Sequence, residues 1–209
     1  MAEEAGSDSR ERIMEATYQA LIETGYANLT MSDIADKSDT STSLLHYHFD
    51  TKEDLLVAFL DHVYGRLVNT FEQTADDHPT DRLHTILGFY VLDPGETERE
   101  SFHIALAELR GQAPYNERYQ ERFTRTDELL ISEVTDIIED GIERGVFTTE
   151  DPSGIAQLLI AAADGARTKG TALGDPSYTR GVLEELYEHV LDELFEPIAS
   201  ERWRELEDT

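Results

Sequence analysis

The fold of this chain is decided by residues 30–56, which read TMSDIADKSDTSTSLLHYHFDTKEDLL. Thr30 and Asp33 are spaced so that the hydroxyl can cap a helix while the carboxylate lies in its positive first turn. Thr51 and Asp54 repeat that spacing and predict the start of a longer helix. The stretch therefore predicts two short helices and the beginning of a third.

A polar turn separates the two short helices. One face of the first carries three apolar residues, Met31, Ile34 and Ala35. Residues 37–40 contain no apolar residue and end this helix. Thr40 or Ser41 caps the second helix, which continues to His48. Helix, short turn and helix is the arrangement of the helix-turn-helix motif, whose second helix enters the DNA major groove.

The second short helix carries most of the residues that we expect to contact DNA. Leu44 and Leu45 are predicted to dock it, leaving the aromatic segment 46–48 exposed. Short hydroxyl side chains suit close approach to the phosphate backbone, and imidazole and phenol groups can donate to phosphates or base edges. The predicted DNA-contacting residues are Thr30, Ser41, Thr42, Ser43, His46, Tyr47, His48 and Lys52.

Roles can be assigned within this set. The predicted base readers are Thr42, Ser43 and His46. Tyr47 and Lys52 are predicted to contact phosphates, Lys52 beside the N-terminal amides of the helix that it begins. Leu45 and Phe49 are predicted to be core residues. The alternative is that the polar side chains form a solvated face that contacts no DNA.

These residues resemble the DNA-binding signature of the tetracycline-repressor (TetR) family, and the match extends back to Arg12. In this sequence the signature residues are Gly25-Tyr26, Thr30, Ile34-Ala35, Ser41, Leu45, Tyr47, His48, Phe49 and Thr51-Lys52-Glu53. Residues 38–40 depart from the usual small-Gly-hydrophobic turn. Thr42 and Ser43 replace a usual Gly or Lys. We expect the turn to form nevertheless, because Asp39 tolerates turn geometry, and these departures can change the DNA sequence that is read.

The rest of the chain also has a helical pattern, with no alternating strand signal after Pro79. Ser9 and Gly25 are the expected cap and end of the first helix, preceded by a frayed tail over residues 1–8. The helices expected outside the short pair are 10–24, 52–75, 82–92, 97–112, 115–144, 153–173 and 177–195. Asp151-Pro152 and Asp175-Pro176 are matched start signals for the last two.

The resemblance implies an all-α, TetR-like fold. Residues 1–50 would be the tail and the three-helix helix-turn-helix domain, and residues 51–209 a helical ligand-binding and dimerisation bundle. GIERGVF at 141–147 resembles the end of the family's long regulatory helix, and LLIAAADGA at 158–166 resembles its dimerisation helix. AELRGQA, at 107–113, resembles the choline-responsive BetI-type regulators.

The net charge of −28 is unusual for a nucleic-acid binder, because phosphate neutralisation supplies much of the affinity for DNA. Residues 1–60 carry four basic side chains against twelve acidic ones. Lysine occurs three times against fourteen arginines, and acidic residues occur in every segment. Dispersed acid with scarce lysine is typical of proteins from organisms with molar salt in the cytoplasm, where repulsion is screened within a few ångströms. The alternative is an acidic low-salt protein that does not bind DNA.

Composition limits the other function classes. The chain has no cysteine, which excludes disulfides and thiolate metal sites. The acidic N-terminal segment does not have the pattern of a signal peptide, and no apolar run is long enough to cross a membrane. We therefore expect a cytoplasmic protein. Asp81 with His84, and Glu100 with His103, have the i, i+3 spacing of di-iron bundles. We nevertheless expect no metal, no cofactor and no enzyme, because no other catalytic constellation is present.

Two further surfaces are predicted on the regulatory helices. The expected ligand pocket consists of Phe89, Tyr90, Phe102, His103, Leu106, Arg110, Tyr119 and Phe123. The alternative for these residues is plain helical core, although aromatic side chains with a few polar groups are usual in binding sites. The expected dimer interface consists of Ile155, Leu158, Leu159, Ala162, Ala166, Leu183, Leu186, Tyr187, Val190 and Leu194. Two helices from each subunit would form an isologous four-helix interface.

The sequence as a whole predicts a homodimeric transcription regulator. Two-fold symmetry would place the recognition helices on a palindromic double-stranded operator, and an unidentified small-molecule effector would release it. The alternative is a helical small-molecule or metal-binding protein with a TetR-like fold that no longer binds DNA.

Overall fold

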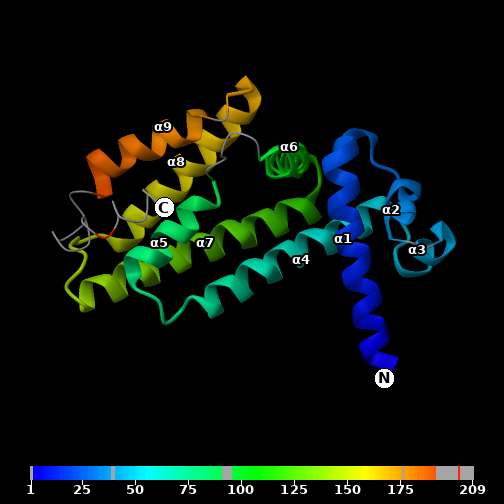
Figure 1. Ribbon diagram of the computed structural model, residues 1–209, viewed down its shortest axis with the longest axis horizontal. Coiled ribbons are helices and arrows are strands. Elements are labelled where there is room, and N and C mark those ends of the chain that lie inside the picture. The colour runs from blue at the N-terminus through cyan, green and yellow to red at the C-terminus, as the bar shows by residue number, and fades with distance from the viewer. Residues whose placement is uncertain (1, 39–40, 91–95, 176, 192–201, 203–209) are drawn as a thin grey trace. The chain divides into compact units, whose positions relative to one another are not determined.

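The computed structural model describes residues 2–38, 41–90, 96–175, 177–191 and 202, with side chains from Ser9 onward. Every regular element within these ranges is helical, as the sequence predicted (Figure 1). None of the helices in the described ranges combines the length and the apolar character needed to cross a bilayer.

The elements follow one another along the chain with short connections. The first four are α1 (Ala2–Asn28), α2 (Met31–Lys37), α3 (Thr42–His48) and α4 (Lys52–Gln73). The remainder are α5 (Pro79–Gly88), α6 (Thr97–Gln112), the 3₁₀ turn η1 (Ala113–Tyr115), α7 (Glu117–Glu143), α8 (Pro152–Leu173), α9 (Ser177–Leu186) and the π-helical turn η2 (Tyr187–Leu191).

The first helix is longer than predicted. It begins at Ala2 rather than at residue 10, so the described part of the expected frayed tail is helical. Its regular geometry breaks at Gly25, where φ is 69° and ψ is 165°. That combination is adopted essentially by glycine alone. The break lies where the sequence predicted the helix end, and one more helical turn continues to Asn28.

The two capping boxes predicted from the sequence are both formed. Oγ1 of Thr30 accepts a hydrogen bond from the Asp33 amide at 3.2 Å, and Asp33 Oδ2 accepts one from the Thr30 amide at 2.8 Å. Thr51 and Asp54 make the same two bonds at 3.1 and 3.0 Å. In each box the threonine hydroxyl also donates to the aspartate at 2.6 Å and lowers its pKa. These local bonds fix where α2 and α4 begin.

Other boundaries are set by similar local chemistry. Ser41 is the cap of α3, accepting from the Leu44 amide at 3.2 Å, whereas Thr40 lies outside the described residues. Asp151 caps α8 by accepting from the Gly154 amide at 2.9 Å, as predicted. Helix α7 begins two residues later than expected, because Asn116 caps it: Oδ1 of Asn116 accepts from the Arg118 and Tyr119 amides at 3.0 and 3.2 Å. Helix α9 ends at Leu186 and gives way to η2, and the predicted continuation to residue 195 lies outside the described residues beyond 191.

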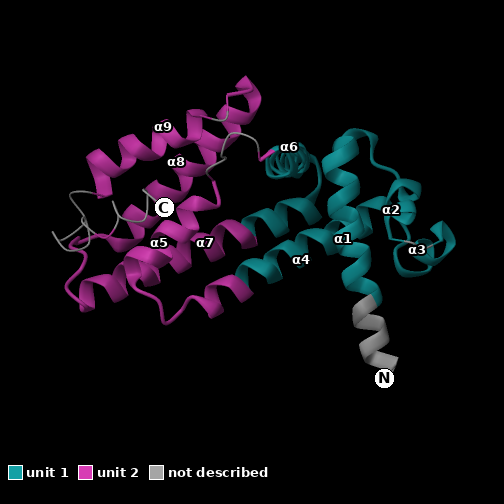
Figure 2. Cartoon of the chain, viewed as in Figure 1, with its two compact units in different colours: residues 1–68, 97–124 teal, residues 69–96, 125–209 magenta. Residues whose placement is uncertain are grey.

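The chain divides into two compact units, each discontinuous in sequence (Figure 2). Unit 1 comprises residues 1–68 and 97–124, and unit 2 comprises residues 69–96 and 125–209. The boundary expected after residue 50 marks the end of the helix-turn-helix motif, whereas these units are defined by compact packing. A functional boundary at residue 50 stays a prediction. Helices α4 and α7 each contribute residues to both units.

Unit 1 is built around one apolar core. Fully buried side chains from α1, α2, α3 and α4 share this core with residues of α6 and α7. Helix α6 packs against α1, and the carboxylate of Glu108 in α6 accepts a hydrogen bond from the Tyr26 amide at 2.7 Å. That bond satisfies a backbone donor directly after the break at Gly25. The helix-turn-helix region is therefore supported by a helix more than 80 residues further along the chain.

Unit 2 packs α8 against α9 and encloses a charged group between α5 and α7. Arg82 of α5 donates to Glu133 of α7 at 2.8 Å, and its second terminal nitrogen lies 3.5 Å from Asp140. The Arg82 side chain is only 10% exposed. The sequence predicted Arg82 as the first residue of a helix over 82–92, whereas α5 begins at Pro79, and the burial of Arg82 against α7 was not predicted.

Candidate nucleic-acid interface

Two residues on one side of the short helix α3 anchor it. Leu45 is fully buried and Phe49, one turn later, is 8% exposed, as predicted for both. Leu44, which was expected to dock the helix, is instead 42% exposed. The expectation was wrong because Phe49 lies four residues from Leu45 on the same face, whereas Leu44 is turned about 100° away. The anchor needs only the face that carries Leu45 and Phe49.

The opposite side of α3 presents polar and aromatic groups to solvent. Ser43, His46, Tyr47 and His48 are exposed, and Thr42 is half-buried. Tyr47 is 82% exposed, and its ring meets that of His48 edge-on at 5.4 Å. Phenol and imidazole groups held at the surface in this way can donate to phosphates and base edges. The structure thus brings the predicted contact residues of α3 together on an accessible surface.

The two capping residues in the predicted set are also exposed, but their hydroxyl groups already form bonds. Thr30 both accepts from and donates to Asp33, and Ser41 accepts from the Leu44 amide. Their first role is to begin α2 and α3. Contact with DNA by either residue stays a prediction.

Lys52 has a structural role that the sequence did not indicate. Its Nζ donates to the carbonyl of Leu29 at 2.9 Å and to that of Tyr26 at 3.3 Å. The ammonium also lies 4.9 Å from the centre of the Tyr26 ring. These contacts tie the start of α4 to the connection between α1 and α2. Since an ammonium has three donors, one remains for the predicted phosphate contact.

Arg10 is a candidate that the sequence prediction missed. With Ile13, His48 and Phe49 it lines a pocket of about 150 Å³ between α1 and the end of α3. Arg10 is exposed, and it places a permanent positive charge beside the aromatic end of the recognition helix. The available signal was its charge, because it is one of only four basic residues in the first 60.

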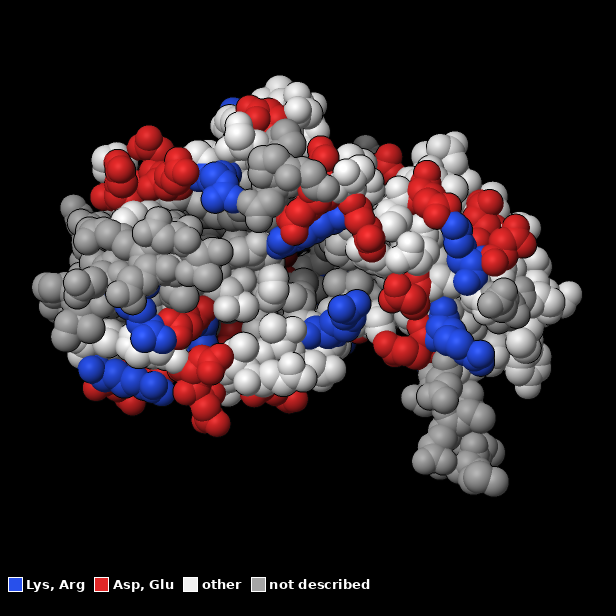
Figure 3. All heavy atoms as spheres, in the orientation of Figure 1, with Lys and Arg blue, Asp and Glu red and all other residues white. Residues whose placement is uncertain are grey.

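Most of the remaining charge in this part of the chain is acidic or paired. Lys37 forms an ion pair with Glu23. Arg118 of α7 lies 2.7 Å from Asp54 and 3.4 Å from Glu53 at the start of α4. On the face shown in Figure 3, the described lysines and arginines form small separate groups among acidic side chains. This face therefore shows no extended basic stripe among its described residues, although such a stripe is usual in DNA-binding domains.

The predicted ligand-pocket residues are divided between the two units. Phe89 and Tyr90 belong to unit 2, where the Arg167 guanidinium lies 4.9 Å from the Tyr90 ring. The other predicted pocket residues, Phe102, His103, Leu106, Arg110, Tyr119 and Phe123, belong to unit 1.

Several of these residues in unit 1 pack within its apolar core. The Phe102 ring lies 5.0 Å from that of Tyr18 and 6.4 Å from that of Phe59. Tyr119 is 2% exposed, and burial raises the pKa of its phenol. Arg110 stacks 5.0 Å from the centre of the Phe123 ring. These contacts agree with the core alternative, and a ligand role for the set stays a prediction.

The predicted dimer residues differ in how far the single chain already covers them. Leu159, Ala166 and Tyr187 are at most 8% exposed, so little of their surface is left for a second chain. Leu158 is 48% exposed on α8. Partly exposed positions are Ile155 and Ala162 on α8, Leu183 and Leu186 on α9, and Val190 on η2. Leu194 lies outside the described residues.

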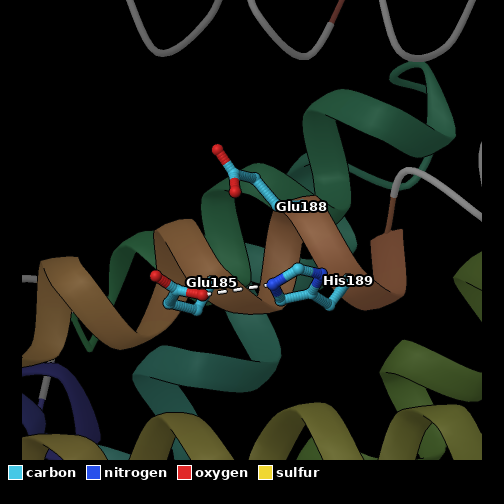
Figure 4. A group of neighbouring side chains, drawn as sticks. All are labelled: Glu185, Glu188 and His189. Atoms are coloured by element: carbon cyan, nitrogen blue, oxygen red, sulfur yellow. Dashed lines mark ion pairs between the residues drawn. The ribbon is translucent and has the colours of Figure 1, made fainter.

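The described residues contain one group with metal-like spacing, Glu185, Glu188 and His189 (Figure 4). One ligand atom from each lies within 4.8 Å of the others, and His189 pairs with Glu185 at 3.3 Å. All three are exposed: Glu185 lies near the end of α9, and Glu188 and His189 lie in η2. Among the described residues, no side chain from another helix joins this group. The Asp81–His84 and Glu100–His103 pairs fall in different units.

Helix α2 begins at a capping box, and α3 follows it with one face anchored in the core and the other exposed. Together with α1, these helices define a helix-turn-helix protein of the class that regulates transcription. Comparison with known proteins agrees. Residues 13–59 match the family described as bacterial regulatory proteins, tetR family, and residues 79–196 match the C-terminal domain of BetI-type transcriptional repressors. The chain belongs to the TetR family of transcription regulators, with a BetI-type C-terminal domain.

Individual relatives support the assignment. A TetR transcription regulator from Haloarcula marismortui is 38% identical, with a TM-score of 0.80 over 91% of this chain and 100% of that chain. The HTH-type regulator YvkB from Bacillus subtilis is 25% identical, covering 80% of this chain and 85% of its own. A transcriptional regulator from Saccharomonospora viridis in complex with choline is 23% identical, with a TM-score of 0.73 over 91% of this chain and 99% of that chain. The last similarity shows the fold alone.

Proposed function

We propose that this regulator represses transcription as a homodimer that binds a palindromic operator through α3 of each subunit. A small-molecule effector would favour a spacing of the two recognition helices that does not fit the operator. The shift can be no larger than the difference in effector affinity between the two states. The proposal places the protein in the cytoplasm and involves no catalytic step.

The observation that carries this proposal is the division of α3 into an anchored face and an exposed one. Leu45 and Phe49 hold the helix, while Tyr47 and His48 are exposed, and His48 lies beside Arg10. A recognition helix needs this arrangement, because its orientation must be fixed while its readout groups stay accessible. The composition of the exposed face, with hydroxyl, phenol and imidazole groups, suits phosphate and base contacts.

The acidic surface supports a regulator that works at high salt. At molar ionic strength the Debye length is about 3 Å, so dispersed carboxylates repel the DNA only weakly. Counterion release contributes little under the same conditions, because the gain falls as the salt concentration rises. Specific binding would then rest on contact geometry. The 38% identical relative from Haloarcula marismortui is consistent with such a setting.

Choline is the first effector to test. The C-terminal domain is of the BetI type, and the regulator from Saccharomonospora viridis binds choline. Aromatic side chains attract quaternary ammonium groups through their ring faces. Phe89 and Tyr90, which belong to the same unit, are the first candidate rings in the predicted pocket set.

The test of DNA binding compares two exposed tyrosines across a series of potassium chloride concentrations. Fluorescence anisotropy would measure binding to duplexes that the wild-type protein selects from a random-sequence pool. We expect Tyr47→Ala to lower affinity roughly 5- to 150-fold, because one good recognition contact is worth about 1–3 kcal/mol. Tyr115→Ala is the matched control, since Tyr115 on η1 is 89% exposed and Tyr47 is 82% exposed. We expect the control to bind as the wild type does.

Two results would contradict the proposed function. If no sequence is enriched at any salt concentration, with or without choline, the protein is not a sequence-specific DNA binder. The alternative of a helical small-molecule binder that has lost DNA recognition would then apply. If Tyr47→Ala and Tyr115→Ala have equal effects, α3 is not the recognition helix.

A further inference from the structure

Leu44 is an exposed leucine on the recognition helix, and the fold does not use it. Its side chain is 42% exposed, although Leu45 beside it is fully buried. Single exposed apolar residues are common on protein surfaces and need no explanation by themselves. Leu44 differs because it lies on a helix of only seven residues, and the exposed face of this helix is the one that we propose contacts DNA.

The exposed apolar groups of α3 lie on one face. Leu44, Tyr47 and His48 are spaced i, i+3 and i+4, which places them on the same side of a helix. Leu45 and Phe49 occupy the anchored side. The exposed face therefore combines an aliphatic group, a phenol ring and an imidazole, with Ser43 at its edge and Arg10 beside His48.

The major groove of DNA offers a specific apolar partner to such a face. The C5-methyl group of thymine distinguishes T·A from the other base pairs, and apolar side chains read it by direct contact. This contact needs no charge on the protein. Nearby positive charge is limited, because Lys37 is paired with Glu23 and Lys52 already donates to two carbonyls. An apolar contact is also less sensitive to salt than a phosphate contact.

We propose that Leu44 is a specificity-determining residue that reads a thymine methyl group in each half of the operator. The inference rests on the proposed function, and it specifies which base feature α3 recognises. Leu44 was not among the predicted DNA-contacting residues. Its role as a reader follows from its exposure and from its place on the face of Tyr47.

The first experiment removes the methyl group and leaves the protein unchanged. Each thymine in the selected duplex is replaced in turn by deoxyuridine, which keeps the hydrogen-bonding pattern and lacks only the methyl. We expect one symmetric pair of positions at which the wild-type protein loses affinity, about fourfold for each methyl group that leaves the interface. The effect should persist at high potassium chloride.

The second experiment changes the side chain. Leu44→Ala should bind the thymine duplex more weakly than the wild type and should no longer distinguish thymine from deoxyuridine at that pair of positions. Leu44→Met, which keeps an apolar group of similar length, should restore the discrimination. Ile104→Ala on α6 is the matched control, because Ile104 is 40% exposed and aliphatic. We expect it to discriminate as the wild type does.

The outcomes separate this inference from the proposed function. If the wild type binds selected duplexes but deoxyuridine has no effect at any position, Leu44 does not read a methyl group, while DNA recognition by α3 stands. The same holds if Leu44→Ala retains full discrimination with an unchanged melting temperature. If the protein selects no sequence, the proposed function fails, and the methyl readout fails with it.

Discussion

Two arginines, one in each unit, each face two carboxylates, yet their surroundings are opposite. Arg82 in unit 2 lies between Glu133 and Asp140 with its side chain 10% exposed. Arg118 in unit 1 reaches Asp54 and Glu53 with its side chain 44% exposed. The first group is enclosed between α5 and α7, whereas the second joins the starts of α4 and α7 at the surface.

The contrast shows where charge can contribute to stability in so acidic a chain. Exposed pairs are screened by salt and typically contribute little, whereas buried pairs are screened much less. Leaving a buried charge without its partner is costly, because desolvation is then not offset. The buried group should therefore hold unit 2 together at any salt concentration, and the exposed group should matter only at low salt.

The strongest test of this contrast removes the buried cation. Arg82→Ala leaves Glu133 without its cation and leaves Asp140 paired only with the more exposed Arg144 at 2.8 Å. We expect a loss of roughly 3–5 kcal/mol in the free energy of unfolding, because a buried carboxylate then lacks its partner. Urea denaturation at fixed potassium chloride would measure it. Arg118→Ala is the control and should change the unfolding midpoint much less. Equal losses in the two variants would contradict the distinction between buried and exposed groups.

An intermediate effect is expected when one buried carboxylate is neutralised. Glu133→Gln keeps an oxygen that can accept from Arg82, but removes the charge opposite it. Hydrogen bonds to charged groups are worth roughly 1.5–3 kcal/mol and typical ones roughly 0.5–1.5 kcal/mol, so we expect a loss of about 1–1.5 kcal/mol. Glu121→Gln serves as the comparison, since Glu121 pairs with Arg122 at 2.9 Å but is 70% exposed. If both glutamine variants unfold at the same urea concentration, burial does not decide the effect.

The smallest effect concerns the exposed pair and is best measured as a pKa. The Thr51 hydroxyl, and then Arg118, lower the pKa of Asp54. Asp54 therefore stabilises the fold above the unfolded pKa, about 3.9, and this contribution is lost as the pH falls through the lower folded value. Arg118→Ala should raise the pKa of Asp54 without restoring its ordinary value, because the Thr51 bond remains.

Asp33 supplies an internal standard for that titration. It forms the same capping box with Thr30, and the Thr30 hydroxyl is the main cause of its lowered pKa. Carboxyl chemical shifts followed by NMR would give both values in one experiment. Arg118→Ala should leave Asp33 unchanged, and an equal shift at both aspartates would show that the arginine acts nonspecifically.

Local sequence signals predicted the helix-turn-helix region well. The caps at Thr30, Thr51 and Asp151 form as expected, because each depends on two groups only three residues apart. The break at Gly25 is equally local. The buried positions Leu45 and Phe49 followed from helical spacing together with the family resemblance. The sequence was informative wherever the deciding contact lies within one helical turn.

Contacts between distant segments could not be predicted in the same way. The orientation of Leu44 depended on whether Phe49 would anchor the helix. The bonds from Lys52 to the carbonyls of Tyr26 and Leu29 join residues more than 20 positions apart. The predicted aromatic pocket set fell into two units because neither periodicity nor composition indicates which helices pack together. The enclosure of Arg82 likewise depends on Glu133, which is 51 residues away.

The bond between Glu108 and the Tyr26 amide also bears on how the protein is made. Unit 1 needs residues 97–124 for its core and for this bond, so it cannot be completed when the first 68 residues leave the ribosome. At 5–20 residues per second, several seconds of synthesis separate the two parts. The helix-turn-helix segment must wait for α6 during that time, with part of its apolar surface uncovered. We therefore expect this segment to be the first part of the nascent chain that a chaperone binds.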